Sequence, residues 1–192
     1  GSNGAAQGWF RLESDRYPEL NQHGGEYYTQ EEFRDFQKYA SDTGILVIPE
    51  LDTPGHALVY TQAWPGTQRP DNKKYLDVTN PEVLEKVKGL FDEYILGCEE
   101  DGYTPTFTGP IVNIGTDEYK TNRGGLSDEE RTKYREGFRA YTDALLKHIK
   151  SRGKEAAFWG SLRENNGTTP VTNDAIMYAW YSGYADAKKS LD

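Results

Sequence analysis

The chain has 192 residues, with 22 basic and 31 acidic side chains that leave a formal net charge of −9. This charge opposes phosphate backbones and anionic membranes, so it disfavours nucleic acid and lipid surfaces as partners. Hydrophobic residues make up only 35% of the chain, yet aromatics reach 13%, which argues against disorder. Cys98 is the single cysteine, which excludes an internal disulfide and a thiolate metal cluster. No apolar run approaches the roughly 20 residues of a membrane span.

The first predicted helix begins after Thr29, because Glu32 follows three residues later and completes a capping box. Its predicted apolar stripe consists of Phe33, Phe36, Tyr39 and Ala40. Residues 45–48 then form a continuous apolar run that Pro49 ends. A run that is apolar on both faces is typical of a strand in a parallel sheet. The sequence therefore predicts a helix followed by a buried strand.

The remainder of the chain alternates helical and strand patterns. Asn80 before Pro81 predicts a second helix start, and Ser127 with Glu130 predicts a capping box for a third helix that runs to about residue 150. Further strands are predicted over residues 111–114, 155–159 and 175–180, and a surface loop over residues 165–170. This element order predicts a parallel sheet with right-handed crossovers.

Polar and aromatic residues gather where the predicted strands end, which is where barrels and open parallel sheets hold their active sites. We therefore expect these residues to converge on one pocket. Carboxylates beside indole rings suit a sugar, because acids act on the glycosidic bond while flat rings stack on the apolar faces of a pyranose. In chain order the strand-end residues are Glu50, Asp52, His56, Asp117, Glu118, Trp159 and Trp180.

Each of these residues also has a structural interpretation, because acids after strands often cap helices and tryptophans often belong to the core. The pair Asp117–Glu118 is the strongest candidate, since it follows a buried strand and precedes no immediate capping box. The acids and His56 could also ligate a hard metal, although a zinc hydrolase normally needs two or three histidines. The sequence contains no glycine-rich phosphate loop and no Gly-x-Ser-x-Gly elbow. We expect no metal and no cofactor.

Four motifs occur in an informative order. The first motif comprises residues 8–13 and 17–20, and the second comprises residues 28–32. The third is Val-Ile-Pro-Glu-Leu-Asp-Thr-Pro-Gly-His-Ala at 47–57, and the fourth is Asn-Ile-Gly-Thr-Asp-Glu at 113–118. Together they resemble glycoside hydrolase family 20, the β-N-acetylhexosaminidases and lacto-N-biosidases. Asn113 and Thr116 stand where many members have histidine and glycine. We associate these variants with the lacto-N-biosidase-like branch.

The resemblance implies a retaining, substrate-assisted glycosidase. Glu118 would be the general acid and later the base, and Asp117 would orient the substrate's 2-acetamido group, which attacks the anomeric carbon to form an oxazolinium intermediate. Consecutive side chains tend to diverge, which suits neighbouring substrate atoms better than the two sides of one bond. Of the other candidates, Asp52 and His56 would hold Glu118 or a sugar hydroxyl, and Trp159 and Trp180 would wall the acetamide pocket.

The resemblance also implies an α/β fold of the (β/α)8 TIM-barrel type, with residues 1–192 forming one partial catalytic domain. Such barrels take about 250 residues, so we expect an incomplete barrel of about four βα units, the family's strands three to six. The expected partner is an N-acetylhexosamine-containing glycan. Open sheet edges would favour edge-to-edge self-association, and the expected location is secreted or cell-surface in a bacterium. The alternatives are a non-catalytic half-barrel and a metal-dependent α/β hydrolase.

Overall fold

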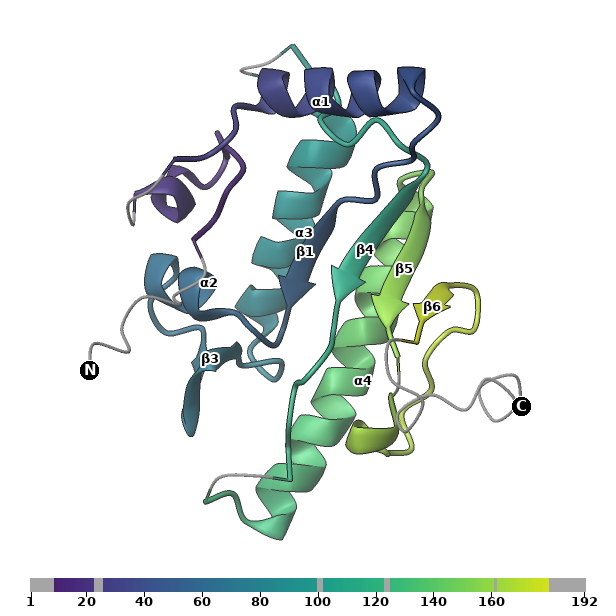
Figure 1. The fold of residues 1–192 in the computed structure, drawn as a ribbon. Coiled ribbons are helices and arrows are strands. Elements are labelled where there is room, and N and C mark those ends of the chain that lie inside the picture. The colour runs from purple at the N-terminus through teal and green to yellow at the C-terminus, as the bar shows by residue number, and fades with distance from the viewer. Residues whose placement is uncertain (1–8, 23–25, 100–101, 123–124, 161, 180–192) are drawn as a thin grey trace, which may run out of the picture.

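The computed structural model describes residues 9–22, 26–99, 102–122, 125–160 and 162–179. Its centre is a four-stranded sheet in the order β1-β4-β5-β6, in which each neighbouring pair is parallel (Figure 1). The strands are β1 (Glu50–Thr53), β4 (Ile111–Gly115), β5 (Glu155–Trp159) and β6 (Ile176–Tyr178). The predicted parallel sheet is therefore confirmed, with β6 shorter than the predicted 175–180.

Helices α3 and α4 lie against one face of this sheet, and α1 lies across the end where the strands begin (Figure 1). The larger helices are α1 (Gln30–Asp42), α3 (Pro81–Leu96) and α4 (Asp128–Ser151). The core between sheet and helices joins Val112 and Ile114 of β4 to Leu90 of α3 and Leu145 of α4, all fully buried. Within the described residues, no helix combines the length and apolarity needed to cross a membrane.

Apart from η1, which precedes α1, the smaller elements lie on the connections between β1 and α3 and between β5 and β6. They are η1 (Pro18–Asn21), α2 (Leu58–Ala63), the antiparallel hairpin β2 (Gln68–Arg69) and β3 (Asn72–Leu76), and η2 (Leu162–Asn165). Neither α2 nor the hairpin is predicted by the local sequence pattern. Both are short, and short elements depend on tertiary packing more than on local sequence preference.

The three predicted helix starts are confirmed. Thr29 and Ser127 each accept a hydrogen bond from the backbone N–H three residues on, and the glutamates there bond back to the cap N–H groups. The Asn80 side chain accepts from the N–H of Glu82. These contacts span at most three residues, which is why the local sequence predicted them correctly.

The predicted apolar stripe of α1 is wrong at two positions. Phe36 and Tyr39 are exposed, whereas Gln37 and Ala40 are buried. The Gln37 amide donates to the Thr106 carbonyl at 2.6 Å and accepts from the Thr108 N–H at 3.1 Å. Because these two bonds satisfy the polar group, a glutamine can occupy the inner face of the helix.

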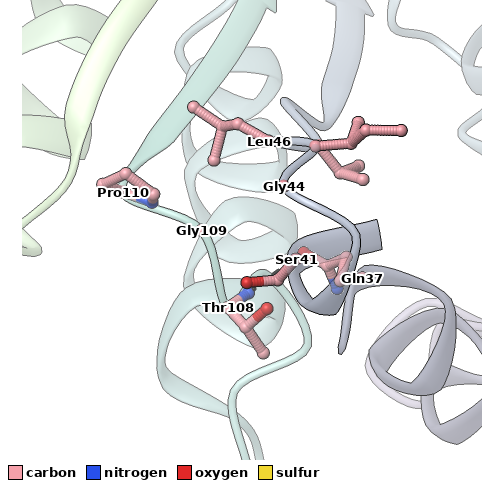
Figure 2. A pocket seen from close by; sticks show the side chains of 9 residues that line it. Gln37, Ser41, Gly44, Leu46, Thr108, Gly109 and Pro110 are labelled. Carbon is pink, nitrogen blue, oxygen red and sulfur yellow. Dashed lines mark hydrogen bonds between the residues drawn. The ribbon is translucent and has the colours of Figure 1, made fainter. Parts of the chain in front are cut away.

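The predicted strand at residues 45–48 is also wrong, because β1 begins only at Glu50. Glu50 lies opposite Asn113, and extending that register toward residue 48 requires an N–H donor at position 49. Proline has none, so the ladder stops there. Ile45 and Leu46 are 60% and 52% exposed. Residues 44–47 and 108–110 instead line an open cavity of about 380 Å³ (Figure 2).

Candidate active site

The loop that follows β4 carries the Asp-Glu pair on an unusual backbone. We call residues 115–121 the acid loop. Gly115, Thr116 and Glu118 have φ angles of 77°, 84° and 54°, in the left-handed region. Non-glycine residues adopt that region at an energetic cost and persist there only when their surroundings hold them, which is a frequent feature of functional sites. The acid loop therefore needs external contacts to keep its shape.

The loop after β1 supplies one of these contacts and brings His56 to the acid pair. A Cβ on Gly55 would lie 2.6 Å from the Asp117 carbonyl oxygen, so only glycine permits the approach. His56 Nε2 lies 3.4 Å from Asp117 Oδ2 and 3.4 Å from Glu118 Oε2. The predicted convergence of His56, Asp117 and Glu118 is thus present in the structure.

Asp52, His56 and Asp117 form a charge-coupled group whose ligand-type atoms all lie within 4.8 Å of one another. The hydrogen bond with Asp117 and the nearby carboxylates raise the pKa of His56 to about 9. Burial and the charge of Asp117 raise the pKa of Asp52 to about 8. Burial opposes ionisation of Asp117 as well, but the hydrogen bond and charge of His56, together with the hydrogen bond with Asp52, outweigh burial and lower the pKa of Asp117. At neutral pH this favours a protonated His56, an anionic Asp117 and a neutral Asp52.

Asp52 is held in this group by the shape of β4. Its Oδ1 is buried without a hydrogen-bond partner among the described residues. A Cβ on Gly115 would contact that oxygen and would lie 2.6 Å from the Asp52 Cα. Gly115 therefore allows the end of β1 to lie directly against the start of the acid loop. The unpartnered oxygen disfavours the charged form of Asp52, in agreement with its raised pKa.

Trp159 lies at the end of β5 and joins three strands. Its indole Nε1 donates to Glu50 Oε2 of β1 at 2.7 Å, and its carbonyl accepts from the Thr116 hydroxyl at 3.2 Å. Its ring packs on Tyr178 of β6, with centroids 5.4 Å apart. Burial raises the pKa of Glu50, against the effect of the indole bond. The second predicted pocket tryptophan, Trp180, lies outside the described residues.

Sequence reasoning missed the side chains that hold the acid loop from outside. Three consecutive carbonyls of this loop each accept a side-chain hydrogen bond. Tyr75 donates to Glu118 at 3.0 Å, Asn165 to Tyr119 at 2.8 Å, and Arg69 to Lys120 at 2.9 Å. The turn-forming Pro70-Asp71 pair is a sequence signal for the hairpin, whereas nothing local identified Asn165. The 165–170 segment was predicted as a surface loop, yet Asn165 is buried.

The group Asp52, His56 and Asp117 also has the ligand types of a small metal site. Two carboxylates and one imidazole could bind a divalent cation if Asp52 were ionised. The raised pKa of Asp52 and the protonation of His56 both oppose this at neutral pH, because metal ligands must be deprotonated. At neutral pH the electrostatics of this group favour protons on Asp52 and His56 over a bound metal ion.

Comparisons with known proteins agree with this geometry. The profile of "Glycosyl hydrolase family 20, catalytic domain" matches residues 5–192. A lacto-N-biosidase of Bifidobacterium bifidum is 30% identical over 171 residues, which are 81% of this chain and 15% of that protein. A beta-hexosaminidase of Vibrio furnissii is 29% identical over 95% of this chain and 31% of that protein.

The structure is similar to that of Flavobacterium johnsoniae chitobiase, with a TM-score of 0.70 and 28% identity over 92% of this chain and 28% of that one. The chain thus spans less than a third of the length of these relatives. Their catalytic domains are (β/α)8 barrels, so the four parallel strands form part of such a barrel. The profile match over nearly all residues and the acid pair at the end of β4 together establish that this chain belongs to glycosyl hydrolase family 20.

Proposed function

We propose that the protein carrying this chain is a retaining glycoside hydrolase that removes terminal β-linked N-acetylhexosamine, or lacto-N-biose, from glycans. The observation that carries the proposal is the consecutive pair Asp117–Glu118 at the end of β4, with one oxygen of each carboxylate 3.4 Å from His56 Nε2. Adjacent carboxylates in one loop suit two neighbouring atoms of one sugar. They do not suit opposite faces of a single bond, as an enzyme nucleophile and an acid would require.

In this proposal Glu118 protonates the departing glycosidic oxygen and afterwards accepts a proton from water. Asp117 remains anionic, because the hydrogen bond and charge of His56, together with the hydrogen bond with Asp52, lower its pKa in spite of burial. An anionic Asp117 accepts a hydrogen bond from the N–H of the 2-acetamido group and stabilises the positive charge of the oxazolinium intermediate. The acetamido carbonyl oxygen forms a bond to the anomeric carbon as the glycosidic bond breaks. Water later attacks the anomeric carbon and displaces this oxygen, so the anomeric configuration is retained.

Asp52 and His56 set the charge of this pair. A protonated His56 stabilises the anionic Asp117, and a neutral Asp52 adds no further negative charge beside it. Trp159 supplies an apolar wall for the acetamide methyl group, oriented by its indole bond to Glu50. Trp180, outside the described residues, keeps the role of a second wall as a prediction.

The proposal is tested with variants Glu118→Gln and Asp117→Asn, and with Glu129→Gln on the exposed first turn of α4 as a matched control. On a methyl N-acetylglucosaminide, Glu118→Gln should lower kcat/KM by about 10²–10⁴-fold, the usual contribution of a general acid. On a dinitrophenyl glycoside, whose leaving group needs no proton, the loss should be far smaller.

Asp117→Asn should impair both substrates, because the acetamide must be oriented whichever group leaves. Replacing the substrate acetamido group by trifluoroacetamido should slow the original enzyme as well. Unchanged turnover of the methyl glycoside by Glu118→Gln would overturn the assignment.

The choice between a monosaccharide and lacto-N-biose is tested by comparing chromogenic N-acetylglucosaminide and lacto-N-bioside substrates. Support for the disaccharide comes from the 30% identity with the Bifidobacterium lacto-N-biosidase. Assaying the isolated chain beside its full natural polypeptide tests the non-catalytic half-barrel alternative. Activity of the full polypeptide alone would favour that alternative for the isolated chain.

We also propose edge-to-edge self-association of the isolated chain, and a secreted or cell-surface location in a bacterium. Support for self-association comes from β1 and β6, which form the two edges of the described sheet. A sedimentation coefficient independent of concentration would contradict self-association. Detection of the protein only inside the cells that produce it would contradict the location.

A further inference from the structure

Side chains of the β2–β3 hairpin are hydrogen-bonded to the backbone of the acid loop. The Tyr75 hydroxyl of β3 donates to the Glu118 carbonyl at 3.0 Å, and the Tyr119 hydroxyl donates back to the Leu76 carbonyl at 3.3 Å. Arg69 of β2 donates to the Lys120 carbonyl at 2.9 Å. Three bonds therefore join the hairpin to residues 118–120.

Arg69 gives the hairpin a rigid base. It is 1% exposed, and its Nε and Nη2 donate to the Asp71 carboxylate at 2.6 and 2.9 Å. Its guanidinium also lies over the rings of Tyr75, Tyr119 and Tyr134, at 4.5, 4.8 and 5.1 Å from their centroids. A buried, bidentate and ring-packed arginine has little freedom. The Tyr75 ring that packs on it is therefore fixed in direction.

The Glu118 backbone has a φ of 54°, which an isolated glutamate would rarely adopt. The hydrogen bond from Tyr75 to the Glu118 carbonyl opposes rotation of the peptide group between Glu118 and Tyr119. It therefore helps to hold this backbone conformation. A change of the backbone angles at Glu118 would swing the carboxylate away from His56 Nε2, now 3.4 Å away, and from Lys120 Nζ, now 3.7 Å away. The Tyr75 hydroxyl thus bonds to the part of the backbone that sets the direction of the Glu118 side chain.

We propose that the β2–β3 hairpin is a positioning element for Glu118 and that Tyr75 is the positioning residue through which it acts. This inference rests on the proposed role of Glu118 as general acid. A general acid must lie within hydrogen-bond reach of the leaving oxygen, and small displacements of a catalytic group weaken proton transfer strongly. Tyr75 itself transfers no proton to the substrate.

The test is Tyr75→Phe in the full natural polypeptide, because it removes one oxygen and leaves the ring on Arg69. Tyr39→Phe, on the exposed face of α1, is the matched control. We measure kcat/KM for methyl and dinitrophenyl N-acetylglucosaminides, since kcat/KM reports steps up to bond cleavage. Tyr75→Phe should lower kcat/KM about tenfold for the methyl glycoside and less than about twofold for the dinitrophenyl glycoside. Tyr39→Phe should change neither.

Equal losses on both substrates would indicate a purely structural role and overturn the proposal, as would no loss on either. A far-ultraviolet circular dichroism spectrum and a thermal melt show whether the variant folds. If it does not fold, Asp71→Asn provides the second variant, because it weakens the fixation of Arg69 and should give the same substrate-dependent loss. Glu118→Gln is assayed in parallel. If that variant keeps full activity on the methyl glycoside, the proposed function fails, whatever Tyr75→Phe shows.

Discussion

The two ends of the parallel sheet are built differently. At the carboxyl end, three successive carbonyls of the acid loop accept hydrogen bonds from Tyr75, Asn165 and Arg69. At the amino end, residues 44–47 and 108–110 line a cavity of about 380 Å³, and Ile45 and Leu46 are exposed (Figure 2). Side chains from distant segments bond to both ends, but the amino end also contains an open cavity and exposed apolar side chains.

The acid loop at the carboxyl end holds strained backbone. The non-glycine residues Thr116 and Glu118 keep left-handed backbone angles at the carboxyl end. Such angles persist only where neighbours over-determine them. Barrel enzymes generally separate a functional carboxyl end from an amino end that serves stability. The same substitution should therefore have unequal effects at the two ends.

The largest expected effect compares two glycines that share a backbone conformation. Gly115 and Gly44 have φ angles of 77° and 81°, but a Cβ on Gly115 would lie 2.6 Å from the Asp52 Cα, whereas one on Gly44 would meet nothing within 4 Å. Gly115→Ala should cost about 3 kcal/mol or more of unfolding free energy, from the left-handed angle together with the clash. Gly44→Ala should cost about 1 kcal/mol, from the angle alone.

Urea unfolding of both variants measures this difference. Gly115→Ala should also abolish glycosidase activity, because it displaces Asp52 from the charged group. Equal costs at the two glycines would show that the ends are packed alike.

The intermediate effect concerns the pH dependence of stability at the carboxyl end. The pKa of Asp52 rises from 3.8 to about 8 on folding, so its stabilising contribution is fully present below pH 3.8 and is lost as the pH rises through 8. His56 behaves in the same direction, and its contribution is lost as the pH rises from 6.5 through about 9. The folded protein should therefore be less stable in mild alkali than in mild acid.

Asp52→Asn removes the first of these contributions while keeping the shape of the side chain. The loss of unfolding free energy between about pH 5 and pH 8 should shrink by about 1 kcal/mol or more in this variant. Urea midpoints at the two pH values measure it. An unchanged difference between those midpoints would show that Asp52 ionises normally in the folded protein.

The smallest effect is expected at the amino end. Ile45→Ala should cost less than about 0.5 kcal/mol, because the side chain is exposed. Ile114→Ala, at a fully buried position of β4, should cost about 2–5 kcal/mol. Thermal or urea unfolding compares them. Similar costs would mean that Ile45 is covered in solution, by a second copy or by further chain.

Local patterns predicted the elements that local chemistry determines. The caps at Thr29, Asn80 and Ser127 need only neighbouring residues. The apolar run at 111–114 and the pattern at 155–159 predicted β4 and β5 correctly, since neither contains a proline that would interrupt a ladder. Motifs in order also placed the acids at strand ends, because the carboxyl ends of parallel strands meet at one edge.

Errors arose where a distant partner decided the outcome. The inner face of α1 depends on the hydrogen bonds between Gln37 and residues 106–108. The start of β1 depends on its pairing with β4, because Pro49 has no N–H to extend that ladder. Neither partner is visible in a window of a few residues. The hairpin has a local turn signal at Pro70-Asp71, but the positions of Arg69 and Tyr75 depend on Tyr119 and on the acid loop.

The sequence by itself therefore determined the family, the parallel βα order, the helix caps and the chemical types at the strand ends, because these depend on residue identity and short-range spacing. Only the tertiary structure decided which ionisable groups lie close enough to shift each other's pKa, and which side chains hydrogen-bond to the acid loop. The bonds of Tyr75 to Glu118, Trp159 to Glu50 and Asn165 to Tyr119 join residues 43, 109 and 46 positions apart. The same folding buries Asp52 beside Asp117 and raises its pKa, because burial and a neighbouring charge arise only when β1 and β4 pair.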